Sequence, residues 1–300
     1  MKNLNLSILL LLAAQLLTSF PALSSESSAE SASQSNLPGQ WRSLLDEKLS
    51  HWEIWMGVPH QSVQGLPPGT VTSFNGHDGT PLGLNNDPKH VFTVRVEAGE
   101  PVLCISGEIF GGLTSLETYS NYHFRVEFKW GERKWAPKLN VPRDNGILFH
   151  CTGPHGAFWN VWKQSLEFQV EEKNMGDLYC LAGTSATVPV VKGEKFWTYD
   201  PAGEMKSVGK VVHLPGDFEK PNGEWNTLEL YAIGQTAVYV VNGKVVQVLR
   251  NIATNKGTKP LNAGQLQIQS EGAEAFYRRI EICSITNYPP EIRAVARLDQ

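Results

Sequence analysis

Alternation of apolar and polar residues constrains this chain more than any other feature, and it dominates the sequence from about residue 90. A period of two is typical of strands with one buried face. It recurs in the stretches 90–97, 122–130, 146–151, 165–171, 227–233, 237–241, 265–269 and 276–285. Asn242-Gly243 adds a hairpin turn between two of these stretches. Since no long helical pattern follows residue 60, we predict one all-β domain, an antiparallel sandwich or jelly roll.

The composition excludes some functions and favours others. The chain has 300 residues and a net charge of −4, and its Lys and Arg residues are spread along it. Without a basic block to neutralise a run of phosphates, nucleic-acid binding is not expected. Nine tryptophans are present. Their rings can pack in a core or stack on the C–H face of a sugar.

The N-terminus resembles a signal peptide. Lys2 precedes an apolar stretch, residues 6–17, that is too short to span a membrane, and a small-residue cleavage site ends at Ser24. We therefore expect export to the periplasm or the extracellular space, without lipid attachment, because no Cys lies near the cleavage site. The alternative is a buried N-terminal helix. The predicted divisions are a signal peptide (1–24), a flexible Ser-rich linker (25–40), the β-domain (41–286) and a C-terminal tail (287–300).

Export makes disulfides chemically accessible, and four cysteines allow three pairings. We predict Cys104–Cys283, because both lie in strand-like segments near the two ends of the domain. Cys151–Cys180 would then flank the most polar region. The alternative is that some of them are buried thiols, and their spacing matches no zinc site.

The alternation also predicts which side chains leave the core, because successive side chains point to opposite faces of a sheet. One predicted strand turns Arg125, Glu127 and Lys129 outward, another turns out Glu167, Gln169 and Glu171, and a third turns out His150 while Cys151 points inward. If these strands are neighbours in one sheet, the side chains form a polar cleft floor. The alternative is an ordinary solvated sheet face.

The densest group of chemically active residues lies between residues 143 and 179 and includes the turn Gly-Pro-His-Gly and the tryptophans 159 and 162. Together with LLDEKLSHWEIWMGVPH (44–60), SGEIFGGLTSLETYSNYHFRVEFKWGERKW (106–135) and FYRRIEICSI (276–285), it resembles the 3-keto-disaccharide hydrolase domain family. The resemblance covers residues 41–286. It implies a concanavalin/laminarinase-like jelly-roll β-sandwich of two antiparallel sheets, with a cleft on the concave face. It also implies an enzyme that cleaves 3-keto-glycosides or 3-keto-disaccharides.

One motif departs from that of the laminarinase-type glycoside hydrolases, which carry Glu-x-Asp-x-x-Glu on one strand. This chain has Glu167-Phe168-Gln169-Val170-Glu171, with Gln in place of Asp and the second Glu at a spacing of four. The departure does not favour a conventional displacement by two carboxylates. A conventional glycosidase and a non-catalytic carbohydrate-binding module nevertheless remain as alternatives.

Keto-sugar cleavage requires a base for the C2 proton, an electrophile for the oxyanion and an acid near the leaving oxygen. The catalytic candidates are His150, Glu167 and Glu127. His150 titrates near neutrality when unperturbed, and the carboxylates can act as bases or orient it. The alternatives are a hydrogen-bonded structural histidine and simple ion pairs with the basic residues beside the glutamates.

Substrate contacts are predicted from residues that can hold an oxyanion, bond to hydroxyls or stack on a sugar. They are Arg125, Lys129, Gln169, His155, Trp159, Trp162 and His60. Several have structural alternatives: ion pairing for the cations, an exposed loop for His155, and core packing for the tryptophans.

Cofactors and partners follow from the same chemistry. The sequence establishes no cofactor, and a divalent metal held by His150, Glu127 and Glu167 stays open, although no sharp ligand spacing supports it. The carbohydrate substrate would need prior oxidation by a sugar 3-dehydrogenase, since no Gly-x-Gly-x-x-Gly follows a strand in this chain. The sequence leaves open the linkage, the aglycone, and whether the product is a keto-sugar or an unsaturated one.

Overall fold

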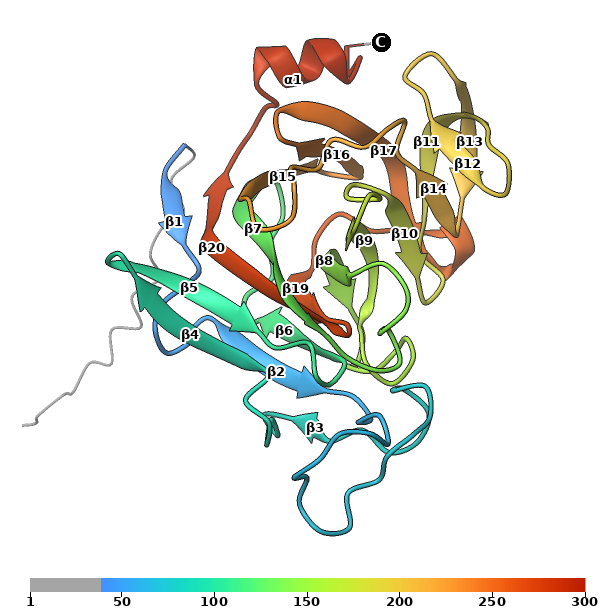
Figure 1. The fold of residues 1–300 in the computed structure, drawn as a ribbon. Helices are drawn as coiled ribbons and strands as arrows, with labels where there is room; N and C mark the ends of the chain where they lie inside the picture. The colour runs from blue at the N-terminus through green and yellow to red at the C-terminus, as the bar shows by residue number, and fades with distance from the viewer. Residues whose placement is uncertain (1–38, 300) are drawn as a thin grey trace, which may run out of the picture. The chain divides into compact units, whose positions relative to one another are not determined.

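The computed structural model describes residues 39–299. The predicted signal peptide and nearly all of the predicted linker lie outside the described residues. Within residues 39–299, no helix is long and apolar enough to cross a membrane. In the described part of the chain, the regular secondary structure consists almost entirely of strands (Figure 1). The prediction of an all-β fold is therefore confirmed.

Two layers of strands make up the fold, and we call them sheet A and sheet B. Sheet A has the order β4 (Phe92–Glu97), β5 (Glu100–Ile105), β20 (Ala273–Ser284), β7 (Tyr122–Lys134), β15 (Asn226–Ile233), β16 (Thr236–Val241) and β17 (Lys244–Thr254), with β1 (Trp41–Ser43) paired to the end of β20. All of these pairs are antiparallel, as the hairpin signals in the sequence indicate.

Sheet B is longer. Its order is β3 (Gly83–Leu84), β2 (Trp52–Met56), β6 (Gly111–Ser115), β19 (Gln265–Ser270), β8 (Asp144–Thr152), β9 (Gln164–Glu171), β10 (Leu178–Leu181), β14 (Val211–His213), β12 (Trp197–Tyr199), β11 (Ser185–Lys192) and β13 (Glu204–Val208). The second half of β17 pairs with β11 and with β18 (Lys259–Pro260), so β17 joins the two sheets. The remaining elements are η1 (Asn255–Gly257) and α1 (Pro290–Val295).

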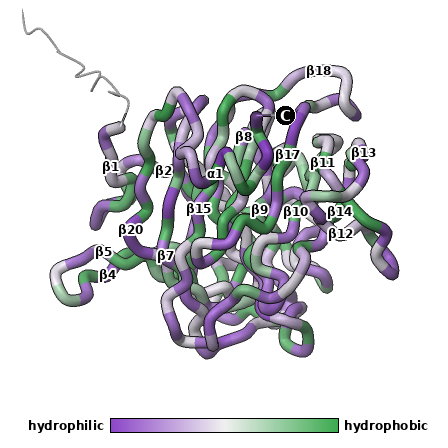
Figure 2. Tube along the Cα trace, turned by 90° about the horizontal axis from the view of Figure 1, so that it is seen from above, coloured by the Kyte–Doolittle hydropathy of each residue, from purple (hydrophilic) through white to green (hydrophobic). Residues whose placement is uncertain are grey.

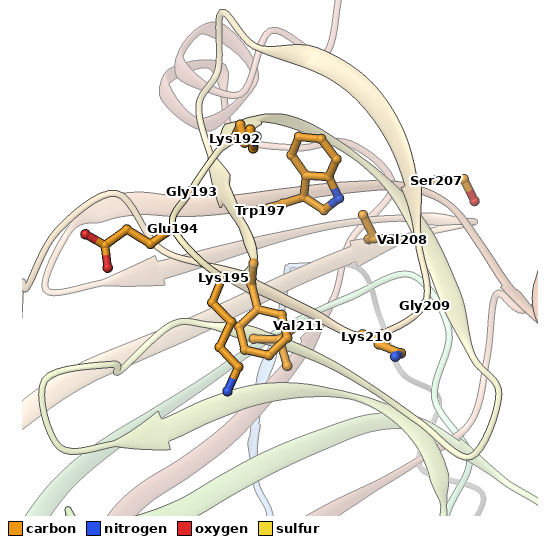
Figure 3. Close-up of a pocket in the computed structure, with 11 residues that line it drawn as sticks. Lys192, Gly193, Glu194, Lys195, Trp197, Ser207, Val208, Gly209, Lys210 and Val211 are labelled. Carbon is orange, nitrogen blue, oxygen red and sulfur yellow. The ribbon is translucent and has the colours of Figure 1, made fainter.

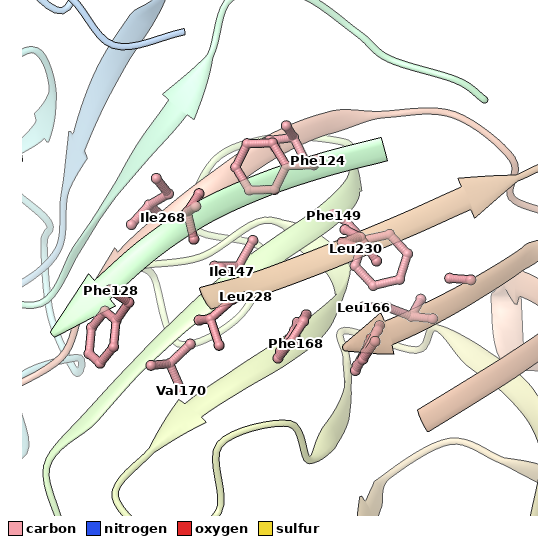
Figure 4. Packing of buried hydrophobic residues seen from close by; sticks show 14 of the residues in the cluster. Phe124, Phe128, Ile147, Phe149, Leu166, Phe168, Val170, Leu228, Leu230 and Ile268 are labelled. Carbon is pink, nitrogen blue, oxygen red and sulfur yellow. The ribbon is translucent and has the colours of Figure 1, made fainter. Parts of the chain in front are cut away.

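The hydrophobic core fills the space between the two sheets, as the alternation predicts. Figure 4 shows side chains of β7 and β15 from sheet A lying against those of β8, β9 and β19 from sheet B. Phe168 of sheet B stacks on Tyr239 of sheet A, with ring centroids 4.5 Å apart. Figure 2 shows the corresponding hydrophobic stretches along the strands. Burying each large apolar side chain contributes about 1.5–3 kcal/mol, so this layer holds the two sheets together.

Buried hydrogen bonds also cross the core and link the sheets directly, and one of them joins two side chains. The hydroxyl of Tyr277 in β20 donates to Asn145 Oδ1 in β8 over 2.6 Å. The Asn145 amide in turn donates to the backbone oxygen of Gln269 in β19 over 2.7 Å. Because Asn145 is fully buried, this chain of bonds fixes the register of β8 and β19 relative to sheet A.

The segment predicted as a C-terminal tail packs against the domain. Tyr288 donates its hydroxyl proton to the Thr236 carbonyl over 2.8 Å and accepts a hydrogen bond from the Ile233 amide. Ile292 and Leu298 pack on the core. The domain therefore continues beyond residue 286.

The predicted disulfides are wrong, since all four cysteines are free. Cys104 pairs with Phe276 in the ladder, and Cys283 lies seven positions further along β20, which is about 23 Å away. A disulfide requires Cα atoms less than about 7 Å apart. Cys180 packs on the core between the sheets, whereas Cys151 lies on the opposite face of sheet B with Leu148 and Trp162.

The bond between Tyr277 and Asn145 gives a test of the link between the sheets. We expect Tyr277→Phe to lower the free energy of unfolding by about 1–2 kcal/mol, because Asn145 Oδ1 keeps only its bond from the Gly146 amide. Urea unfolding followed by fluorescence measures the change. An unfolding midpoint equal to that of the wild type would show that the bond contributes nothing.

Candidate functional site

Polar side chains form rows on the face of sheet B that is turned away from sheet A, which we call the site face. The ladder registers align one row across β2, β6, β19, β8, β9 and β10: Glu53, Thr114, Gln267, Leu148, Glu167 and Tyr179. The next row contains Trp55, Gly112, Gln269, Gly146 and Gln169. The strands that supply the core with apolar residues thus supply this face with carboxyl and amide groups.

Three carboxyl groups and one ammonium group gather beside β8, β9 and the end of β19 on this face. We call Lys138, Asp144, Glu167 and Glu271 the acid cluster. The Lys138 ammonium lies 2.5 Å from Asp144 Oδ2 and 3.0 Å from Glu271 Oε1. Each of the three acidic residues is only 4–5 % exposed. A group of three buried acids with one cation cannot be fully ionised at low cost.

Protons therefore remain on part of the cluster near neutral pH. Burial, followed by the charge of Asp144, raises the pKa of Glu271 to about 8. Burial, with the charges of Glu271 and Asp144, raises the pKa of Glu167 well above its usual range. Burial also raises the pKa of Asp144, although Lys138 opposes it. Burial works to lower the pKa of Lys138, but the charges of Glu271 and Asp144 outweigh it and keep the ammonium charged.

Two glutamines complete the cluster and leave acceptors unused. Gln169 Nε2 donates to Asp144 Oδ1 over 3.2 Å, and the Gln269 side chain lies beside Glu167 next to Gly146. The Oε1 atoms of both glutamines are buried and accept no hydrogen bond from residues 39–299. Buried acceptors of this kind are usually satisfied. A ligand that presents hydroxyl groups would supply the missing donors.

Gly146 makes room for this arrangement. A Cβ at position 146 would lie 2.2 Å from Glu167 Oε1 and 2.5 Å from Gln269 Oε1. Any larger residue would therefore displace one of these two side chains. The absence of a side chain in the middle strand lets the flanking ones converge.

A histidine and several aromatic rings lie at the β2 end of the same face. His155 Nε2 lies 2.9 Å from Glu53 Oε1, and the His155 ring stacks on Trp55. Burial lowers the pKa of His155 despite the neighbouring Glu53. Trp159 stacks on His77 and is 45 % exposed, so its ring is accessible to a ligand.

Trp162 lies in the protein interior. Its indole nitrogen donates to the Gly111 carbonyl, and its ring packs against Phe110. Because the side chain is only 2 % exposed, the prediction of a sugar platform at Trp162 is wrong, and the core-packing alternative holds. His60 bonds to Ser62 within the connection from β2 to β3 and does not contact the acid cluster.

The predicted orientation of His150 is also wrong. His150 has φ of 50°, and the register of β8 shifts between Phe149 and Thr152, which is a β-bulge. The bulge turns His150 into the core beside Tyr122 and Phe149, and it turns Cys151 onto the site face. Burial lowers the pKa of His150 to about 4, and neither ring nitrogen has a partner in the described part of the chain.

The three candidates on β7 belong to the other sheet. Arg125 pairs with Glu281, Glu127 pairs with Arg278 and Arg279, and the Lys129 ammonium lies over the Trp225 ring. They therefore occupy the outer face of sheet A, on the far side of the core from Glu167. The proposed metal set of His150, Glu127 and Glu167 is not brought together, and residues 39–299 contain no group of three or more His, Cys, Asp or Glu side chains placed to hold a metal.

Sequence reasoning placed Glu167 and Gln169 on the site face but missed four further residues. The alternation in QLQIQS (265–270) carried a signal for Gln269, since its glutamines share one face. Lys138 lies in a connection and Glu271 directly follows a strand, so periodicity gave no signal for either. Asp144 is the first residue of β8 and precedes the alternating stretch.

Comparisons with known proteins support a carbohydrate-active family. The model of a family described as 3-keto-alpha-glucoside-1,2-lyase-like domain matches residues 40–283. No curated protein matches the sequence significantly.

Among solved structures, a candidate glycosyl hydrolase from Parabacteroides distasonis is 15% identical, with 82% of this chain and 100% of that chain covered and a TM-score of 0.46. The LamAcat protein from Zobellia galactanivorans is 11% identical, with 83% and 98% covered and a TM-score of 0.43. The carbohydrate-binding module CBM66 from Bacillus subtilis is 9% identical, with 63% and 91% covered and a TM-score of 0.38.

The raised pKa of Glu271 predicts a pH dependence of stability. Its carboxyl group has an ordinary pKa of 4.5, and the folded protein raises this pKa to about 8, so the folded state binds the extra proton between these values. This group's contribution to the free energy of unfolding is fully present below pH 4.5. It is lost as the pH rises to 8, with a slope of at most about 1.4 kcal/mol per pH unit. We expect Glu271→Gln to gain stability relative to the wild type as the pH rises. Urea unfolding from pH 5 to 8 measures this, with Glu281→Gln on sheet A as the control. Parallel profiles for the wild type and Glu271→Gln would contradict the prediction.

The lowered pKa of His150 predicts that stability changes with pH in the opposite direction, and at lower pH. Its ordinary pKa is 6.5 and its folded pKa is about 4, so between these values the unfolded chain binds the extra proton. Stability therefore falls as the pH is lowered from 6.5 to 4, again by at most about 1.4 kcal/mol per pH unit. We expect His150→Phe to be less sensitive to acid than the wild type in this range. Thermal unfolding at several pH values measures this, and an unchanged acid sensitivity would place His150 in contact with solvent.

Proposed function

Because the chain belongs to the 3-keto-alpha-glucoside-1,2-lyase-like domain family, we propose that it cleaves 3-keto-glycosides by elimination across C1 and C2. Hydration of the product would then give the free 3-keto-sugar, a net hydrolysis. The observation that carries this proposal is the acid cluster on the site face, flanked by two buried glutamine oxygens that accept no hydrogen bond within the described part of the chain. It combines groups that exchange protons with groups that recognise hydroxyls.

The reaction depends on the carbonyl at C3. This carbonyl acidifies the C2–H bond, and a base removes the C2 proton while the electron pair moves to give an enediolate. When the C3 carbonyl re-forms, the electron pair of the enediolate double bond forms a C1–C2 double bond. At the same time the C1–O bond breaks, and its electron pair leaves with the oxygen. The leaving oxygen then takes up a proton from an acid, so the base gains one proton from C2 and the acid gives one to the leaving group.

Glu167 is the proposed base. A carboxylate whose pKa is raised by burial is a stronger base than an exposed one, and its two neighbouring acids contribute to the raised pKa of Glu167. Gln269 lies beside this side chain, and Gly146 leaves room for both of them. The ionised form of Glu167 would accept the C2 proton.

Glu271 and Lys138 are the proposed acid and electrophile. With a pKa of about 8, Glu271 carries a proton near neutral pH and can donate it to the leaving oxygen. The Lys138 ammonium, held by Asp144 and Glu271, would lie near the negative charge that develops on the C3 oxygen. Gln169 and Gln269 would accept hydrogen bonds from hydroxyl groups of the ring.

The cellular setting is part of the proposal. The sequence suggests export, and a separate sugar 3-dehydrogenase would have to supply the oxidised sugar. The exposed Trp159 ring offers a stacking surface at the β2 end of the site face.

We test the proposal with a 3-keto-glucoside and its unoxidised parent, each incubated with the purified protein while release of the aglycone is followed. We expect release from the keto form only. Glu167→Gln should lower kcat/KM about a hundred-fold or more, because it removes the general base. Glu127→Gln is the matched control, since Glu127 lies on the far side of the core and should keep the wild-type rate.

The other outcomes separate the alternatives. Release from the unoxidised parent would identify a conventional glycosidase and would make Glu167 and Glu171 the pair to examine. Loss of release with a chelator would make a metal the electrophile in place of Lys138. Release from neither sugar would contradict an enzymatic role and leave a carbohydrate-binding module.

A further inference from the structure

A cavity of about 420 Å³ opens in the lobe formed by β11, β12, β13 and β14. Its walls are the turn between β11 and β12 and the turn between β13 and β14 (Figure 3). The lining includes Lys192, Glu194, Lys195, Phe196, Trp197 and Lys210. We call it the lobe cavity. Its volume falls within the usual range for small-molecule sites.

The lobe cavity begins where a row of the site face ends. Glu167 pairs with Tyr179 in β10, and Tyr179 pairs with Val211 in β14. Val212 packs on the core, so its neighbour Val211 points to the site face, where it lines the cavity. Two strand spacings separate Glu167 from Val211, which is about 10 Å. A substrate of two rings could therefore reach from the acid cluster into the cavity.

The lining combines positive charge with aromatic surface. Three lysines and one glutamate line the cavity, so its formal charge is 3 − 1 = +2, whereas the whole chain carries −4. Within residues 39–299, none of Lys192, Lys195 and Lys210 forms an ion pair. The Lys195 ammonium lies 5.2 Å from the centre of the Phe196 ring. The Phe196 ring also packs edge-on against His213, which bonds to the buried Asp177.

These features match a ring that carries a negative charge. Unpaired ammonium groups bind a carboxylate, and the rings of Phe196 and Trp197 provide a surface for another ring. We propose that the lobe cavity binds the leaving group of the substrate, and that this group is a ring bearing a carboxylate. Only the assignment of this acid as the leaving group rests on the proposed function. A uronic acid and an aromatic acid share this chemistry, so the experiment includes both.

Binding of the free acid tests the cavity without requiring catalysis. We would titrate 4-hydroxybenzoate, glucuronate and the neutral 4-hydroxybenzamide into the wild type and into the double variant Lys195→Gln/Lys210→Gln by calorimetry. At least one acid should bind more tightly than the amide. The double variant should weaken that acid about ten-fold or more, because it removes two charged donors. The matched control is Lys244→Gln/Lys259→Gln, which changes two exposed lysines outside the cavity.

These titrations show which kind of acid the cavity binds and which results would overturn the proposal. Tighter binding of 4-hydroxybenzoate indicates an aromatic leaving group, and tighter binding of glucuronate indicates an acidic sugar. Equal binding of the acids and the amide, or acid binding that the cavity variant leaves unchanged, overturns the proposal. The Glu167→Gln variant should bind the acid as the wild type does.

A kinetic arm connects the cavity with turnover. The 3-keto-glucosides of 4-hydroxybenzoate and 4-hydroxybenzamide have leaving groups of similar size that differ in charge, and the cavity variant controls for their different reactivity. The wild type should prefer the first, and Lys195→Gln/Lys210→Gln should lose that preference while both substrates are still cleaved. If neither substrate is cleaved but the acid still binds in the cavity, the proposed function fails and the assignment of the cavity as an acid site stands. If both are cleaved at equal rates by the wild type, the leaving-group assignment fails.

Discussion

The Lys138 ammonium between Asp144 and Glu271 is the interaction on which the site face depends. Buried carboxylates repel one another, and one shared cation lowers that cost for two of them. Glu167 is the third acid and has no such contact, so it shares in the raised pKa values of the group. The cluster thus holds more acid groups than it can ionise. This surplus makes proton transfer available near neutral pH.

The same strands build the core and the site. In β8 and β9, Ile147, Phe149 and Phe168 face sheet A, while Gly146 and Glu167 face the other way. Because a shift of one residue would exchange the two faces, the packing of the core also fixes which side chains reach the site. The hydrogen bonds from Tyr277 through Asn145 to Gln269 reinforce this register at the point where the cluster forms.

The sequence allowed the strands and the orientation of Glu167 and Gln169 to be predicted, since both follow from alternation alone. Three things could not be predicted. The β-bulge at His150 changes the direction of one side chain without changing the residue pattern. The assignment of β7 to the opposite sheet from β8 and β9 depends on long-range pairing, so Glu127 and Glu167 look equivalent in the sequence. Lys138 and Glu271 reach the cluster from a connection and a strand end, where periodicity does not apply.

The position of β19 and β20 has a consequence for how the chain matures. Each lies in the middle of its sheet: β19 separates β6 from β8, and β20 separates β5 from β7. Yet both lie near the C-terminal end of the chain, at residues 265–284. During synthesis from the N-terminus, the four flanking strands therefore have unpaired edges. Neither sheet is continuous until residues 265–284 have been made. A chain that stops before residue 265 has two divided sheets, so the domain can close only after nearly the whole protein has been made.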